Sequence, residues 1–355
     1  MPGDLPVQTS GLDHPAPGAQ HDADPSAAAP TAAPAFAAPQ LPLLRLELVF
    51  TMEEPVELPP FRGSLWRGVL GPALKRIDEG LLPGLSTGEI EPGTLYRTFF
   101  ESPPPPGATR MRLYDAAPHP YVVDAPGVSG FRRLEPGATE RIGLTLAGRA
   151  ATACEAVLAG FDFAARVGLG VQLGRARERG RGRLVEARAV WRGDDVETPV
   201  FDEARGFRPA AAESPKIPPC PRRLRVILAS PLRLTRDGRP VGPRGFRAGT
   251  LVANLVRRVS MLQTFFADGP LETDFRALKA LWEGLTAQEP MLALADQRRW
   301  SGHQKQELDM GGIIGSFVLD MDGREALFPY LWLGQWIHAG KGAVMGMGAI
   351  RLKAE

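Results

Sequence analysis

One order of elements occurs twice in this chain, and this duplication limits the folds open to it. Each half opens with a strand in which apolar and polar residues alternate, at 43–50 and 224–228, followed by a helix that begins near a Phe-Arg pair at Phe61 and Phe246. Each half then passes through a β-like middle and a second helix to a glycine-rich or basic loop and a last strand. A repeat of roughly 170–185 residues in this order predicts two β-α-β-β-α-β units, which is an α+β fold of tandem ferredoxin-like domains.

Local patterns predict the elements between these landmarks. The apolar spacing favours second helices at 148–166 and 327–337. We expect Pro72 to kink or interrupt the first helix, because proline removes a backbone donor. Short strands are predicted in the first half, around 94–101, 110–115 and 138–147.

The distribution of proline predicts the domain boundaries. Residues 1–40 are rich in Pro and Ala and bury too little apolar surface to offset their chain entropy, so we expect a disordered tail. An N-terminal ferredoxin-like domain is predicted at 41–208 and a proline-rich linker at 209–222. The C-terminal ferredoxin-like domain, with the glycine-rich loop, is predicted at 223–355.

Composition narrows the class of protein. The sequence has no uninterrupted apolar stretch of about 18 residues and no secretory signal, and its two cysteines are far apart, so we expect a cytoplasmic protein with reduced thiols and no membrane contact. The first 40 residues carry four Asp and no Lys or Arg, so the remaining chain has a net charge of about +6, against +2 for the whole. This charge favours an anionic partner, although a general preference for arginine explains it equally well.

A glycine-rich loop follows His338 near the C-terminus. Glycine lets backbone N–H groups approach a ligand closely, and a lysine adds positive charge, so the loop suits a phosphate-rich ligand. It lacks the Gly-x4-Gly-Lys-Ser/Thr order of the nucleotide P-loop. A simple turn before the last strand is the alternative interpretation. The residues concerned are Gly340, Lys341, Gly342, Gly346 and Gly348.

The order and spacing of several motifs resemble one family. The chain resembles the CRISPR-associated endoribonucleases of the RAMP superfamily, which process precursor repeat RNA, from about residue 41 onward. The resemblance implies tandem ferredoxin-like domains and a cut within each CRISPR repeat. It implies metal-free attack of the ribose 2′-OH on the phosphate, giving a 2′,3′-cyclic phosphate and a 5′-OH. The motifs are Phe61–Gly68, Ser230–Leu234, Leu255–Leu262, Arg299–Gln304, Gly311–Gly315 and His338–Gly348.

This chemistry needs a base, an acid and cations for the charged phosphorane. Histidine suits the first two roles near neutral pH, so His338 and His303 are predicted catalytic residues. Tyr330 is the third predicted catalytic residue, as an alternative to a histidine. An arginine run in the loop before the last strand of the first half would follow an RNA backbone well, although such a run is also typical of a solvated face. The predicted RNA-binding residues are the glycine-loop residues Gly340, Lys341, Gly342, Gly346 and Gly348, together with Arg175, Arg177, Arg179, Arg181, Arg183, Arg62, Arg67, Arg299 and Lys305.

One departure from the family keeps a second function open. Many members carry a catalytic His in or just after the first helix, whereas residues 61–80 contain none. The alternative is therefore a catalytically inactive RAMP subunit that binds guide RNA in an effector complex; a third, unrelated alternative is a nucleotide-binding enzyme. The resemblance implies CRISPR repeat RNA as the partner, with other CRISPR effector subunits as a further class. We expect no metal site and no small-molecule cofactor.

Overall fold

The structure is a computed structural model, and it describes residues 36–103, 117–125, 127, 130–173, 178–190, 197–236, 238–295, 298–301 and 306–355. Residues Ala35–Glu355 pack together as one unit. In the part of the chain that is described, no helix is long and apolar enough to cross a membrane.

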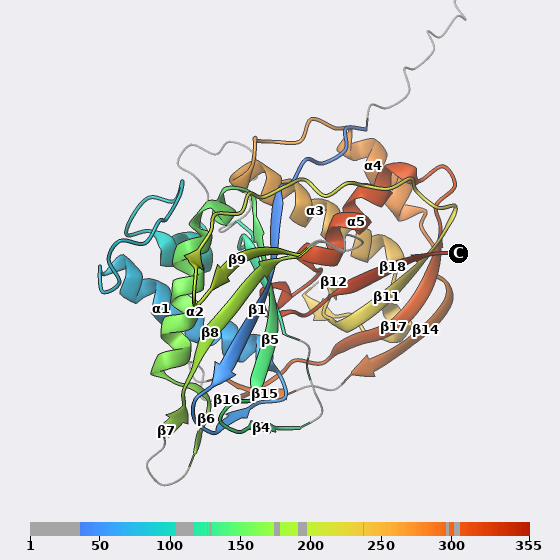
Figure 1. The fold of residues 1–355 in the computed structure, drawn as a ribbon. Coiled ribbons are helices and arrows are strands. Elements are labelled where there is room, and N and C mark those ends of the chain that lie inside the picture. The colour runs from blue at the N-terminus through green and yellow to red at the C-terminus, as the bar shows by residue number, and fades with distance from the viewer. Residues whose placement is uncertain are drawn as a thin grey trace, which may run out of the picture. The chain divides into compact units, whose positions relative to one another are not determined.

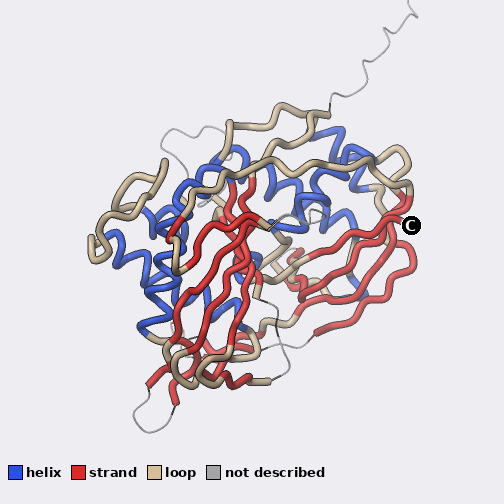
Figure 2. Tube along the Cα trace, viewed as in Figure 1, coloured by secondary structure: helices blue, strands red, loops and turns tan. Residues whose placement is uncertain are grey.

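A six-stranded antiparallel sheet forms the first half, in the order β10-β9-β8-β1-β5-β3 (Figures 1 and 2). Four of its strands and two helices follow each other along the chain as β1-α1-β3-β5-α2-β8. The spatial order β8-β1-β5-β3 is that of a ferredoxin-like unit, as predicted. The elements are β1 (Leu43–Met52), α1 (Arg62–Asp78), β3 (Tyr121–Asp124), β5 (Thr139–Ala147), α2 (Cys154–Val167), β8 (Gly182–Ala189), β9 (Thr198–Asp202) and β10 (Gly206–Phe207).

The second half repeats this topology in a four-stranded sheet of order β14-β17-β11-β18. Along the chain its elements run β11-α3-β14-β17-α5-β18, with one additional helix, α4, after α3. The predicted α+β fold of two ferredoxin-like units is therefore confirmed. The elements are β11 (Arg223–Leu232), α3 (Ala248–Phe266), α4 (Phe275–Glu283), β14 (Gln288–Ala295), β17 (Gly312–Asp320), α5 (Phe328–Ile337) and β18 (Ile350–Ala354).

Short two-stranded ribbons and single turns complete the described chain. The pairs are β2 (Val56–Leu58) with β4 (Arg132–Leu134), β6 (Leu169–Leu173) with β7 (Glu178–Gly180), β12 (Thr235–Arg236) with β13 (Arg239–Pro240), and β15 (Arg298–Ser301) with β16 (Gln306–Asp309). The turns are a π-helical turn at Arg97–Glu101 and 3₁₀ turns at Gly148–Ala153, Pro243–Gly245, Glu325–Leu327 and Ala343–Met345.

Alternating side chains in β1 explain why one face of the first sheet is buried. Leu44, Leu46 and Leu48 are buried, whereas Arg45 and Glu47 between them are only half-buried. Successive strand residues point to opposite faces, so the leucines face the core that α1 and α2 cover. α3 and α5 contribute in the same way to a second core with the second sheet. Each half therefore has a core of its own, as a duplicated unit requires.

Two local predictions differ from the structure. The strand predicted around 94–101 is wrong, because this segment is helical and ends in the π-helical turn Arg97–Glu101. Its apolar side chains pack as one face of a turn, with Phe99 buried and Tyr96 stacked on Phe100 at 5.2 Å between ring centroids. Pro72 lies inside α1 and does not end it. The strand predicted at 110–115 lies outside the described residues, and the predicted domain boundaries stay predictions.

Candidate functional site

The glycine-rich loop lies against the start of α1. A Cβ added at Gly63 would lie 2.0 Å from the Met345 carbonyl oxygen, so only glycine permits this approach. Phe61 and Met347 are buried beside this contact, together with Met310. A Cβ at Gly346 would lie 2.9 Å from the carbonyl oxygen of Val123 in β3. The loop from the second half therefore contacts both α1 and β3 of the first half.

Many of the loop's backbone N–H groups donate hydrogen bonds inside the protein. The Gly340 N–H donates to Asn254 Oδ1 at 2.8 Å, and the Lys341 N–H donates to the Arg233 carbonyl at 2.8 Å. The Gly348 N–H donates to the Pro231 carbonyl at 3.0 Å. These amides are not available to a phosphate in this structure. The glycines Gly340, Gly342, Gly346 and Gly348 instead supply positive φ angles of 65–86°. Their role in RNA binding stays a prediction.

Ser230 holds the loop from the end of β11. Its hydroxyl donates to the Gly346 carbonyl at 2.7 Å and accepts from the Ala349 N–H at 2.8 Å. One side chain therefore satisfies two backbone groups on either side of the last loop glycine. Sequence patterns assigned Ser230 no role beyond the family motif, because its partners lie more than 110 residues away.

His338 ends α5 in an unusual conformation. Its side chain is 1% exposed, and its φ and ψ of 57° and 169° lie in a region that non-glycine residues rarely occupy. The buried Nδ1 atom has no hydrogen-bond partner among the described residues. A strained backbone and an unpaired buried polar atom each cost free energy, and such features cluster at functional sites.

Charged groups from both halves surround His338. Burial lowers its pKa to about 4; Asp124 opposes this shift, and Arg45 and Arg258 add to it. Arg45 and Asp124 form an ion pair at 3.5 Å. Arg258 donates from Nε to the Ile337 carbonyl at 2.8 Å, at the negative end of the α5 dipole. His338 is therefore neutral at pH 7, in contact with both halves of the protein.

His119 is a second histidine near the same arginine. It is half-buried, and its Nδ1 lies 2.9 Å from the buried Ser102 hydroxyl. Burial, together with the charges of Arg67 and Arg258, lowers the pKa of His119 to about 4. Arg258 thus lies close enough to influence both His119 and His338. The residues predicted from the sequence did not include His119, because its position between Pro118 and Pro120 resembles a simple loop.

The other predicted catalytic residues are Tyr330 and His303. Tyr330 in α5 is 1% exposed, and its hydroxyl has no hydrogen-bond partner among the described residues. Burial raises the pKa of Tyr330, so its phenol stays protonated. His303 lies outside the described residues. The catalytic roles of His338, His303 and Tyr330 stay predictions.

Arg62 and Arg67 lie on α1 in different surroundings. Arg62 is buried and forms an ion pair with Glu140 in β5 at 2.5 Å, and Arg132 contacts the same carboxylate at 3.4 Å. Burial raises the pKa of Glu140, and both arginines oppose that shift. The Arg67 guanidinium lies 4.9 Å from the centroid of the Phe100 ring. Arg62 therefore anchors α1 to the sheet, whereas Arg67 belongs to the surroundings of His119.

The predicted basic loop is partly neutralised by carboxylates. Arg181 pairs with Glu54 at 2.5 Å, and Arg183 pairs with Glu53 at 3.1 Å and with Glu203. Arg179 is exposed. Arg175, Arg177 and Lys305 lie outside the described residues, and Arg299 lies in β15, where side chains are not described.

Lys341 lies on the rim of a cationic hollow. It is exposed, and it lines a cavity of about 380 Å³ with Arg233 and Arg257. Asn254, which accepts the Gly340 N–H, lines the same cavity. Three cations around one hollow suit an anion. Among the described residues, no group of three or more His, Cys, Asp or Glu side chains could hold a metal ion.

Comparison with known proteins finds one family match in each half of the chain. Residues 226–350 match the family described as CRISPR-associated endoribonuclease Cas6, and residues 41–213 match a family described as an N-terminal domain. Residues 226–350, in the second half of this chain, are therefore similar to the Cas6 family. The predicted resemblance to the CRISPR-associated endoribonucleases of the RAMP superfamily is confirmed. The Cas6 match includes α3, α5 and the glycine-rich loop up to Ile350.

Solved Cas6 structures have a similar fold. A product complex of a Thermus thermophilus Cas6 is 16% identical to this chain, with a TM-score of 0.52, and covers 88% of this chain and 99% of its own. A product complex of another Cas6 is 20% identical, with a TM-score of 0.45, and covers 88% of this chain and 100% of its own. The first of these similarities shows the fold and nothing finer. A comparison with curated proteins found no match.

The contact between α1 and the glycine-rich loop predicts opposite effects for two glycines of one helix. Gly63→Ala places a methyl group against the Met345 carbonyl and should lower the free energy of unfolding by about 1–3 kcal/mol. Gly68→Ala, with no atom within 4 Å of the new Cβ, should raise it by up to about 1 kcal/mol through helix propensity. Urea unfolding of both variants tests this, and equal effects would contradict the contact.

The burial of His338 predicts a pH dependence of stability. Its pKa of about 4 in the folded protein is below the unfolded value near 6.5, so the unfolded chain takes up the proton first. His338 therefore favours folding fully above about pH 6.5, and this contribution, on the order of 3 kcal/mol, is lost between about pH 6.5 and 4. The unfolding free energies of wild type and His338→Asn should converge over that range. A difference that is constant with pH would refute this assignment.

Proposed function

We propose that the protein is an endoribonuclease that cleaves precursor CRISPR RNA within its repeats. The observation that carries the proposal is the Cas6 match over residues 226–350, which contain α3 and the glycine-rich loop. The contact of that loop with α1 supports a reaction centre between these elements. In this proposal the RNA phosphate lies near the cluster of His119, His338 and Arg258.

The reaction is a transesterification within the RNA. The ribose 2′ oxygen attacks the adjacent phosphorus, the new O2′–P bond replaces the P–O5′ bond, and the products carry a 2′,3′-cyclic phosphate and a 5′-OH. A base removes the proton from the 2′-OH, and an acid gives a proton to the leaving 5′ oxygen. No metal ion takes part in this proposed route, because side chains supply the acid, the base and the positive charge.

Two histidines and an arginine suit these three roles. His119 and His338 are neutral at pH 7, which is the form a base needs. A nearby RNA phosphate would raise the pKa of either histidine, because it stabilises the protonated form, and the other role then becomes available. Arg258 supplies positive charge near both. His338 must become accessible when RNA binds, since it is 1% exposed in the free protein.

The function predicts cleavage that does not depend on a metal ion. In EDTA, the protein should cut its repeat RNA at one position and leave a cyclic phosphate, which mass spectrometry identifies. RNA with a 2′-deoxy nucleotide at that position should bind equally well and remain uncut, because the nucleophile is missing. Binding without cleavage of the all-ribose RNA would instead favour a catalytically inactive RAMP subunit. Cleavage that requires added Mg²⁺ would refute the metal-free route.

The proposed roles predict the effects of histidine substitutions. His119→Ala and His338→Ala should each slow single-turnover cleavage about 10²–10⁴-fold, with RNA affinity largely retained. His338→Asn, which keeps a polar side chain at this position, separates loss of the imidazole from loss of folding. Far-UV circular dichroism and thermal unfolding serve as the folding control. Wild-type rates in both alanine variants would move the reaction to other residues, with His303 and Tyr330 next in order.

A further inference from the structure

One segment of the second half has a large excess of positive charge. Residues 233–258 contain seven arginines and a single acidic residue, Asp237, a net charge of +6 against +2 for the whole chain. The sequence patterns that predicted RNA-binding loops did not include this segment, because its arginines are spread over a hairpin, a turn and a helix. Folding brings several of them to the surface around the start of α3.

Arg244 and Arg247 lie at the start of α3, are exposed and carry no carboxylate partner among the described residues. Arg244 lies in the 3₁₀ turn before α3, and Arg247 occupies the N-cap position of α3. In the first half, by contrast, exposed arginines such as Arg141 and Arg181 pair with glutamates at 2.7 and 2.5 Å. The charges of Arg244 and Arg247 are therefore available to an external anion.

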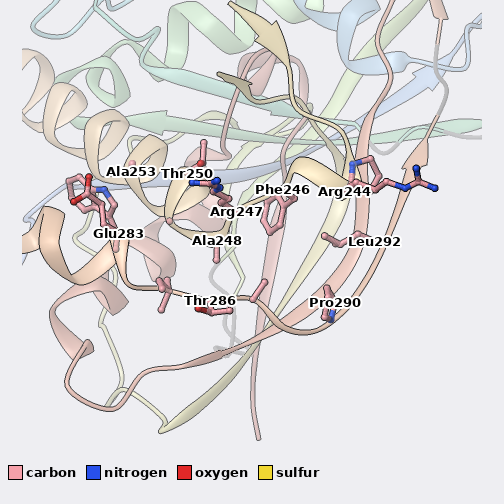
Figure 3. A pocket seen from close by; sticks show the side chains of 15 residues that line it. Arg244, Phe246, Arg247, Ala248, Thr250, Ala253, Glu283, Thr286, Pro290 and Leu292 are labelled. Atoms are coloured by element: carbon pink, nitrogen blue, oxygen red, sulfur yellow. The ribbon is translucent and has the colours of Figure 1, made fainter. Parts of the chain in front are cut away.

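A cavity of about 750 Å³ opens between these two arginines and the end of α4. Its lining includes the apolar side chains Phe246 and Leu292, and Trp282 from α4. In Figure 3, Phe246 lies between Arg247 and Arg244, Leu292 lies below Arg244, and Glu283 lies at the opposite side of the view. Among the described residues, Glu283 is the one carboxylate in the lining, and it pairs with Lys279 at 3.5 Å. The volume falls in the range of small-molecule sites, and the apolar lining with two arginines suits an aromatic group that carries phosphate.

This cavity adjoins the hollow near the glycine-rich loop. Both are lined by Thr250 and Ala253 of α3, and the second is lined by Arg257 and Lys341. Arg257 is ten positions after Arg247, which corresponds to roughly 15 Å along the helix. Exposed cations therefore lie at both ends of this stretch of α3, at a spacing that suits a short stretch of polynucleotide.

We propose that this surface binds a single-stranded segment of RNA outside the cleavage centre. Arg244, Arg247, Arg257 and Lys341 contact the phosphates, and one unstacked base enters the cavity beside Phe246. The RNA is single-stranded here because a base within a duplex is stacked and paired and cannot enter a concave pocket. Aromatic side chains and a cationic groove are the features that bind single strands without strict sequence preference. The identity of the ligand as RNA rests on the proposed function.

The first test compares two RNAs that cannot be cut, both with a 2′-deoxy nucleotide at the scissile position. One is a minimal repeat, and the other carries a single-stranded extension of about ten nucleotides at either end. The double variant Arg244→Ala and Arg247→Ala should bind the extended RNA about tenfold more weakly than wild type at 0.15 M salt. The slope of log affinity against log salt should fall by about 1.4, since each lost contact to a single strand contributes about 0.7.

The matched control removes the same charge elsewhere. Arg76 and Arg133 are exposed arginines of the first half that already pair with Glu79 and Glu135. The Arg76→Ala and Arg133→Ala double variant should bind both RNAs as wild type does. Equal affinity of wild type and the Arg244/Arg247 variant for the extended RNA would overturn the proposal. An equal loss in both double variants would also overturn it, because general charge would then explain the effect.

A second test addresses the base in the cavity. RNA carrying 2-aminopurine at successive positions of the extension should show a fluorescence change at one position when it binds, as that base leaves its stacked neighbours. Thr286→Trp, a substitution of an exposed residue that lines the cavity, should abolish this change by filling the space. A signal that is identical in wild type and Thr286→Trp would refute the base site.

Failure of this proposal and failure of the proposed function give different results. Wild-type protein that binds the extended RNA as described but never cuts the all-ribose RNA contradicts the endoribonuclease and leaves the α3 surface intact. Wild-type protein that cuts the minimal repeat but gains nothing from the extension contradicts the α3 surface alone. An unrelated peptide could compete with the extended RNA for the wild-type protein but not for the Thr286→Trp variant. That result would identify the cavity as a protein-docking site and overturn the proposal.

Discussion

The close approach of the glycine-rich loop to the first turn of α1 joins the two halves where the candidate site lies. Gly63 has no side chain, so the Met345 carbonyl can approach the helix, and Gly346 permits a similar approach to β3. Ser230 fixes the loop from the opposite side by bonding two of its backbone groups. The positions of His338, Lys341 and the end of α5 all depend on this contact, because each lies within or next to the loop that it holds.

The hydrogen bonds of the glycine-rich loop change the interpretation of its role. Its glycines first suggest a backbone cradle for phosphate, yet Gly340, Lys341 and Gly348 direct their amides to Asn254 and to carbonyls of the β11 segment. The loop is thus a rigid support, and cationic side chains around it are the groups left to meet an anion. His338 is buried beneath this support, with strained backbone and an unpaired ring nitrogen. Burial in a low-dielectric site, more than any single neighbour, keeps it neutral.

Ion pairing with carboxylates decides which arginines are available to bind a nucleic acid. Arg181 and Arg183 are prominent in the sequence, but their charges are largely matched by Glu53 and Glu54. Arg244 and Arg247 are less conspicuous, and no carboxylate among the described residues pairs with them. Because a neighbouring carboxylate offsets the charge of a paired arginine, the density of arginine along a sequence is a poor guide to the electrostatic surface of the protein.

The sequence alone determined the duplicated topology. Alternation in β1, the helix faces and the recurring order of elements are local patterns that tertiary packing then reinforced, and the family resemblance followed from motif order. Sequence patterns wrongly assigned residues 94–101 to a strand. Tyr96, Phe99 and Phe100 are compatible with a strand as well as with a helical turn, and their packing decides between the two. Only the tertiary structure decided which charges are paired and that His338 is buried. Only the tertiary structure places His119 near Arg258 and Ser230 against the glycine-rich loop. Those properties depend on contacts between residues far apart in the chain, which no local pattern encodes.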